Sequence, residues 1–189
     1  AVGAILWLIV AKLQHNAAMF FLELWQGMKA DSTALIADSM DFFSDSLSYI
    51  ITLYVIQRHI HVRAKAALFK ASCMLLLAAV ALLQGVSNLI YNATPNYETM
   101  GLVGTLALIV NIISAMLLYG SRGRDSNMRS VWLCSRNDAF ANILILVAAF
   151  FVYATNSMWP DFLVALGIAW LGGSSALKII QHAKQELRG

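Results

Sequence analysis

Long apolar segments alternate with short polar ones along the whole chain. A membrane crossing takes about 20 apolar residues, so the pattern predicts six transmembrane helices. The break before the second segment ends in Ser32, a residue type that is favoured at helix N-caps. The predicted segments are 5–28, 33–57, 66–91, 99–119, 129–153 and 161–181. We therefore expect an all-α polytopic membrane protein, with residues 1–189 forming a single six-helix transmembrane domain and no soluble C-terminal domain.

Composition supports this prediction and argues against three other classes of protein. The 189 residues are 60% hydrophobic and 12% charged, whereas a soluble domain carries roughly 25% charged residues. The net charge of +3 comes from scattered Lys and Arg that form no basic face, so we do not expect a nucleic-acid partner. Cys73 and Cys134 both lie in apolar segments, which argues against a disulfide framework.

The positive charges predict the orientation in the lipid bilayer. They are concentrated in the second predicted loop, the fourth predicted loop and the tail, namely at Arg58, Arg63, Lys65, Arg122, Arg124, Arg129, Lys184 and Arg188. Loops rich in Lys and Arg remain in the cytoplasm. With an even number of crossings, the N- and C-termini are therefore both expected on the cytoplasmic side.

Acidic residues inside the predicted spans are the main candidates for function. Asp38, Asp41 and Asp45 lie in the second segment at spacings of three and four, which place them on one helical face. An ionised Asp at the centre of a membrane helix costs about 2.5–3.5 kcal/mol, and like charges at this spacing repel each other. Stability alone does not account for such a stripe.

The fifth segment carries a second pair, Cys134 and Asp138, which are also four residues apart. It enters from the opposite side of the membrane, so this pair can meet Asp41 and Asp45 near the midplane. Four ligands on two facing helices suit a tetrahedral divalent metal. A simpler interpretation stays open for any single Asp, which could satisfy a helix end or pair with Arg136.

The neighbouring polar residues are candidates for a supporting shell around this metal site. Asp38 lies nearest the outer end and fits either a ligand or a polar first-turn residue. Asn16 and Glu23 share one face of the first segment, and Asn142 lies one turn after Asp138. The supporting candidates are Asp38, Asn16, Glu23, Asn142 and Asn137.

The ligand types predict the transported ion and its exchange partner. An empty site of three carboxylates and a thiol is expected to take up protons, which a divalent cation displaces on binding. Such a site meets the minimal requirement for metal/proton antiport. A thiolate with carboxylates suits Zn²⁺ and Cd²⁺ best, while Co²⁺, Fe²⁺ and Mn²⁺ stay open. The metal is then a substrate, and we expect no prosthetic group and no enzymatic activity.

The stretch Ser32–Asp45 resembles the second-helix signature of the cation diffusion facilitators, in which a His or Asp is followed four residues later by Asp. Residues 132–138 look like the matching fifth-helix motif, and Asn16, Glu23 and Gly27 are also similar to the family pattern. The resemblance implies a homodimeric exporter that works by alternating access as a secondary active transporter, in a cell membrane such as the bacterial inner membrane. It implies a metal site of Asp41, Asp45, Cys134 and Asp138. Position 134 is commonly His or Asp in the family.

Other interpretations stay open at this stage. A subunit of a hetero-oligomeric transporter can keep this fold without transporting metal. A CDP-alcohol phosphotransferase-like enzyme also pairs acids on a helix, but Phe42 stands where its motif needs Gly. An intramembrane aspartyl protease would need a Gly where Arg136 stands.

Overall fold

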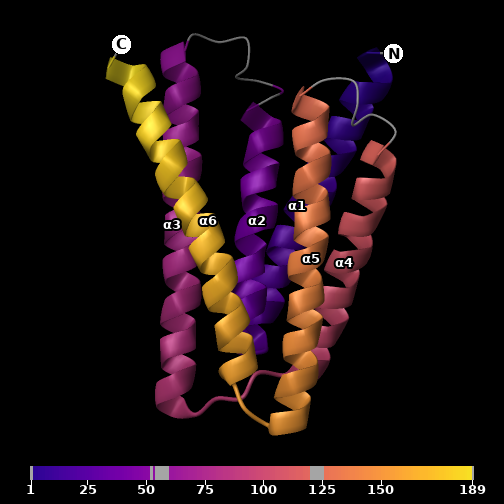
Figure 1. Ribbon diagram of the computed structural model, residues 1–189, viewed down its shortest axis with the longest axis vertical. Coiled ribbons are helices and arrows are strands. Elements are labelled where there is room, and N and C mark those ends of the chain that lie inside the picture. The colour runs from indigo at the N-terminus through magenta and orange to yellow at the C-terminus, as the bar shows by residue number, and fades with distance from the viewer. Residues whose placement is uncertain (1, 52, 54–59, 120–125, 189) are drawn as a thin grey trace.

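The computed structural model describes the backbone of residues 2–51, 53, 60–119 and 126–188, and the side chains of these ranges except 2–6, 8, 60, 118 and 126–135. Over this part of the chain the fold is all-helical, which confirms the predicted class. The helices are α1 (Val2–Lys29), α2 (Thr33–Ile50), α3 (Ile60–Tyr91), α4 (Tyr97–Tyr119), α5 (Ser126–Thr155) and α6 (Trp159–Arg188). They run up and down in one bundle, and α1 begins at the same end at which α6 finishes (Figure 1). The bundle therefore has the even number of crossings that the sequence predicts.

Two helices extend well beyond the predicted apolar segments. Helix α3 begins at Ile60 rather than at residue 66, and α6 continues to Arg188 rather than ending at 181. Hydropathy marks the part of a helix that lies in lipid, whereas backbone hydrogen bonding continues past the membrane surface. His61, Arg63 and Lys65 are accordingly exposed at the start of α3. Residues 52 and 54–57 of the predicted second segment lie outside the described residues.

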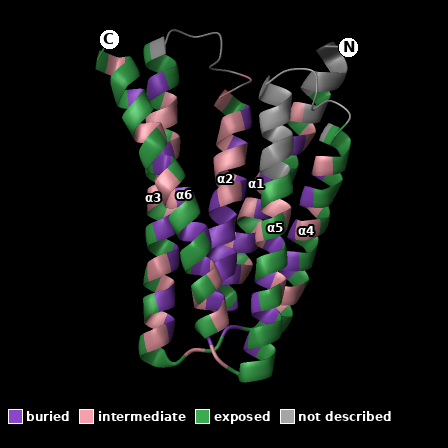
Figure 2. Cartoon of the chain, in the orientation of Figure 1, coloured by how far each residue is buried: buried purple, intermediate pink, exposed green. Residues whose placement is uncertain are grey.

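The polar helix α2 lies at the centre of the bundle. Within the described residues, α3, α4, α5 and α6 are long and apolar enough to cross a membrane. Helix α2 carries three Asp in 18 residues and contacts α1, α3, α5 and α6. Every residue from Ser32 to Met40 is buried, and Figure 2 shows this concentration of buried residues in the half of the bundle away from the termini. Asp38, the first of the three acids of α2, is thus enclosed by protein rather than by lipid.

The first turn of α2 is held by a buried carboxylate from α6. Asp161 is fully buried, and its oxygens accept hydrogen bonds from Ser32 Oγ (2.6 Å), Thr33 N (2.6 Å) and Ala34 N (3.2 Å). Ser32 in turn caps the helix by accepting from Leu35 N. A negative charge at a helix N-terminus satisfies backbone donors that have no partner within the helix. This contact joins the outer ends of α2 and α6.

The helix ends on the same side are tied together by polar contacts with the backbone. Helix α1 is followed by Asp31, which has a positive φ of 52°, a conformation that reverses the chain within a short turn. Its carbonyl accepts from Asn88 Nδ2 of α3 at 2.6 Å, and its carboxylate accepts from Gln84 Nε2 at 3.1 Å. The carbonyl of Ala30 accepts from Asn96 N before α4. At the end of the bundle away from the termini, hydrogen bonds therefore join α2 to α6, and the turn after α1 to α3 and to the segment before α4.

Two glycines allow neighbouring helices to approach α2 closely. A Cβ added at Gly27 of α1 would lie 3.0 Å from the backbone nitrogen of Ile36, a contact that cannot relax by a side-chain movement. A Cβ added at Gly172 of α6 would lie 2.0 Å from the end of Met40. Small residues at such crossings are typical of membrane helices. They bring α1 and α6 against the face of α2 next to its acids.

We predict that Asp161→Ala lowers the free energy of unfolding by about 3 kcal/mol, because Ser32, Thr33 and Ala34 lose a charged acceptor in a buried site. Denaturant unfolding in detergent micelles measures this change. Glu98→Ala is the matched control, since Glu98 is also an acid in a first turn but is exposed. Equal stability of the two variants would contradict the anchoring role of Asp161.

Candidate metal centre

The three acids of α2 form a stripe that becomes more accessible toward the end of the bundle that holds the termini. Asp38 is 1% exposed, while Asp41 and Asp45 are half-buried. Asp41 interacts electrostatically with both of the other acids, as their helical spacing requires. The stripe therefore runs from the buried half of the bundle, away from the termini, toward the end that holds the termini.

Helix α5 brings a fourth acid to this stripe. Asp138 is half-buried and interacts electrostatically with Asp45, Asp41 and Asp38. Acids on two helices that enter from opposite ends thus lie within electrostatic range of one another, and the shared metal site of Asp41, Asp45 and Asp138 stays a prediction. The side chain of Cys134 lies outside the described residues. Among the described side chains, no three His, Cys, Asp or Glu residues lie close enough together to hold one metal ion.

Behind the acids, a chain of amides links three helices. Asn142 Nδ2 of α5 donates to Asp38 Oδ2 at 2.5 Å, and Asn142 Oδ1 accepts from Asn111 Nδ2 of α4 at 3.0 Å. All three residues are buried. The amide of Asn142 can satisfy both neighbours because it carries a donor and an acceptor. Asn142 therefore fixes the position of Asp38 relative to α4 and α5.

Helix α1 contributes two polar residues on one face. Asn16 Nδ2 donates to Asp45 Oδ2 at 3.3 Å, so it supports the inner end of the stripe. Glu23 is 0% exposed and interacts with Asp38, Asp41 and Asp138. The structure thus brings both supporting candidates on α1 to the acids of α2 and α5.

Two lysines also interact with the acids of the site. Neither is among the site residues that the sequence predicts. Lys12 of α1 is 7% exposed and interacts with Asp45 and Asp138. Lys70 of α3 interacts with Asp41 and Asp45. Both lie within helices that pack against α2, and a cation inside an apolar segment is itself a signal of function. Lys12 also lies one turn before Asn16, on the same face of α1.

The family comparison agrees with this arrangement. Residues 9–187 of the 189-residue chain match the cation efflux transmembrane domain. The chain belongs to the cation efflux family. This result confirms the resemblance to the cation diffusion facilitators, and it identifies a cation efflux transporter of the membrane-integral type. No curated protein matches the chain.

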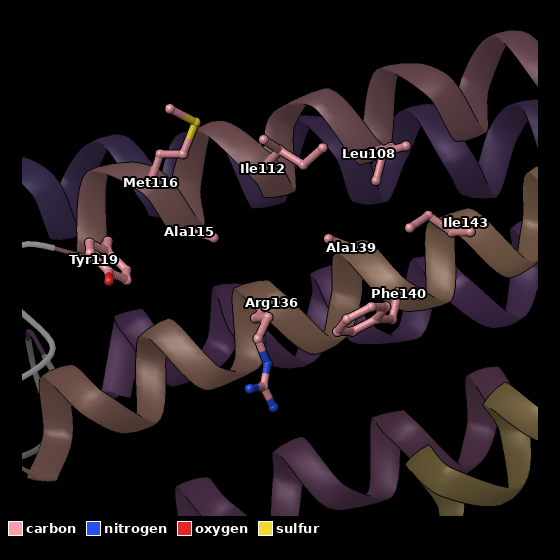
Figure 3. Close-up of a pocket in the computed structure, with 9 residues that line it drawn as sticks. All are labelled: Leu108, Ile112, Ala115, Met116, Tyr119, Arg136, Ala139, Phe140 and Ile143. Carbon is pink, nitrogen blue, oxygen red and sulfur yellow. The ribbon is translucent and has the colours of Figure 1, made fainter.

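Two polar residues of the α5 motif lie away from the acid stripe of this cation efflux protein. Arg136 is exposed and lines a groove of about 390 Å³ between α4 and α5, together with Ala139 and Phe140 (Figure 3). Arg136 Nη2 donates to Asn137 Oδ1 at 3.2 Å, and Asn137 is exposed. The structure therefore brings Asn142 to the acids but not Asn137.

We predict that Asn142→Ala lowers the thermal stability and the metal affinity of this cation efflux protein, and that Asn137→Ala lowers neither. The first change leaves Asp38 without its amide donor and Asn111 without its acceptor, at a cost of about 1–3 kcal/mol in a buried site. Thermal unfolding in detergent and metal affinity by calorimetry measure the two effects. Similar losses in both variants would show that the amide chain has no special role.

Proposed function

We propose that this cation efflux protein exports divalent transition-metal ions in exchange for protons, with Asp41, Asp45, Cys134 and Asp138 as the metal ligands. The observation that carries the proposal is the electrostatic interaction of Asp138 on α5 with Asp41 and Asp45 on α2. Family membership supports cation efflux, and the ligands, the ion and the coupling are our inference from the site.

The balance of charge at the site supports a cation as substrate. In the described part of the chain, five carboxyl groups gather at the site, and the ammonium groups of Lys12 and Lys70 oppose them. The acids outnumber the lysines by three, and excess charge of one sign is costly away from water. A divalent ion offsets most of this excess. The site is therefore suited to a doubly charged substrate.

The same excess of carboxyl groups supports exchange for protons. When the metal leaves, the acids that held it can instead be neutralised by protons, and the next metal must displace these protons to bind. Competition at one site becomes coupled transport if the protonated and metal-bound forms favour opposite-facing conformations. The proposal therefore needs one site and two conformations.

The structure supports access to the site from the end that holds the termini. There the acids Asp41 and Asp45 are half-buried, whereas Asp38 is buried and the outer ends of α2 and α6 are joined through Asp161. With the termini in the cytoplasm, this is the conformation that loads metal from the cell interior. Release outside would require the contacts at the outer end to separate.

Cys134 supports Zn²⁺ or Cd²⁺ as the substrate. It lies one helical turn before Asp138 in the continuous helix α5, so both residues belong to the same face. Thiolates favour these soft or borderline ions over Mg²⁺ and Ca²⁺, which require oxygen ligands. We further propose that two copies act together as a homodimer in the cell membrane, as the family resemblance implies.

We predict that Asp41→Asn and Asp138→Asn each lower metal transport by roughly 10- to 100-fold, a range that even the loss of a supporting residue can reach at a metal site. The assay is Zn²⁺ uptake into proteoliposomes with an acidic interior. Cys134→Ser in the same assay shifts the preference from Zn²⁺ and Cd²⁺ toward Co²⁺ and Mn²⁺. Glu186→Gln, a change at an exposed acid of α6, is the control and transports normally.

Two outcomes would contradict the proposal. Wild-type protein that moves none of these ions under the proton gradient is not a metal/proton antiporter. Normal transport by both Asp variants would show that the metal passes elsewhere in the protein.

A further inference from the structure

Glu23 is a buried acid that the metal site does not use as a ligand. Its side chain is fully buried, and neither carboxyl oxygen has a hydrogen-bond donor among the described residues. Asp161, which is buried to the same extent, accepts from Ser32, Thr33 and Ala34. Ionised carboxylates in protein interiors require such donors or a cation. Glu23 therefore lacks the surroundings that would stabilise its ionised form.

The group that Glu23 does reach is another carboxyl group. Glu23 and Asp38 lie within hydrogen-bonding reach of each other, across the contact between α1 and α2. An ionised carboxylate has acceptors only, so a hydrogen bond between two carboxyl groups requires a proton on one of them. Asp38 also accepts from Asn142 Nδ2, whereas neither oxygen of Glu23 has a donor among the described residues, so we assign the proton of the pair to Glu23.

We propose that Glu23 and Asp38 together bind one exchangeable proton, at a site separate from the metal ligands, and that this proton leaves when a divalent ion binds beside them. This inference rests on the proposed metal/proton exchange. It assigns one of the exchanged protons to an acid pair that does not itself hold the metal.

The surrounding charges explain how the metal would displace this proton. The charged groups that face Glu23 are Asp38 and Asp41 on α2 and Asp138 on α5. Lys12 on α1 acts on Asp45 and Asp138, and Lys70 on α3 acts on Asp41 and Asp45. On α6, which packs against α2, Asp161 is held at the N-terminus of α2; on α4, which packs against α1, the charged residue described is Glu98, which is exposed.

In the metal-free protein, the acid pair is thus surrounded by negative charge, which favours the proton. A divalent ion at Asp41 and Asp138 reverses the sign of the nearest charge. The O–H bond of the protonated carboxyl group then breaks, its electron pair stays on the carboxyl oxygen, and a water molecule accepts the proton. The charge of the ion is conveyed to the pair through space, and the pair need not touch the metal.

The test is the number of protons released for each Zn²⁺ bound, measured by titration calorimetry in buffers of different protonation enthalpy. Glu23→Gln keeps a donor for Asp38 through its amide but has no proton to lose, so we expect this variant to bind Zn²⁺ and release about one proton fewer per ion than wild type. Asp38→Asn removes the other half of the pair and shows the same loss. Glu98→Gln is the control and releases the wild-type number.

Infrared difference spectra provide a second readout that does not depend on the proton count. Zinc binding should remove the absorption of a protonated carboxyl group in wild type, and this change should be missing in Glu23→Gln. Zinc binding by Glu23→Gln with the wild-type proton count and the wild-type infrared change would overturn the inference. If wild type binds no zinc, the proposed function fails. The acid pair is then judged by the spectrum without metal, where a protonated-carboxyl band in wild type that Glu23→Gln lacks supports it and identical bands contradict it.

Discussion

The structure depends on one constraint, which is that charge inside a membrane bundle must meet opposite charge. Carboxyl groups from α1, α2 and α5 gather around the centre of the bundle, where water is scarce and an isolated negative charge is costly. Lys12 and Lys70 offset part of this charge, and Asn142 and Asn16 donate hydrogen bonds to Asp38 and Asp45. Under the proposed function, the divalent ion or the protons that the site binds offset the rest, which links the fold to transport.

Helix α2 both carries the central acids and makes the close packing contacts of the bundle. Its outer end is fixed by Asp161, and Gly27 and Gly172 allow α1 and α6 to lie directly against it. A helix held this firmly at one end presents its acids in a fixed order, with Asp38 enclosed and Asp45 nearer the inner side. The depth of each acid therefore follows from how the N-terminus of α2 is anchored.

Hydrophobic period and charge spacing predict much of this arrangement, because both depend on neighbours along one helix. The six helices and the shared face of Asp38, Asp41 and Asp45 follow from the sequence in this way. Contacts between segments that are far apart in the sequence cannot be predicted in this way. From the sequence, Asp161 is only an acid in the first turn of a helix, and its contact with Thr33 is visible only in the fold. In the same way, no neighbouring residue in the sequence indicates that Asn142 contacts Asp38.

The central claim is that one divalent ion is held between α2 and α5 by acids of both helices. Diffraction at the zinc absorption edge from crystals grown with Zn²⁺ locates the ion directly. Our account predicts an anomalous peak bounded by Asp41, Asp45 and Asp138, and no such peak at this place in crystals of Asp138→Asn. A zinc peak found only at the ends of the bundle, with these three carboxylates turned away from it, would contradict the account.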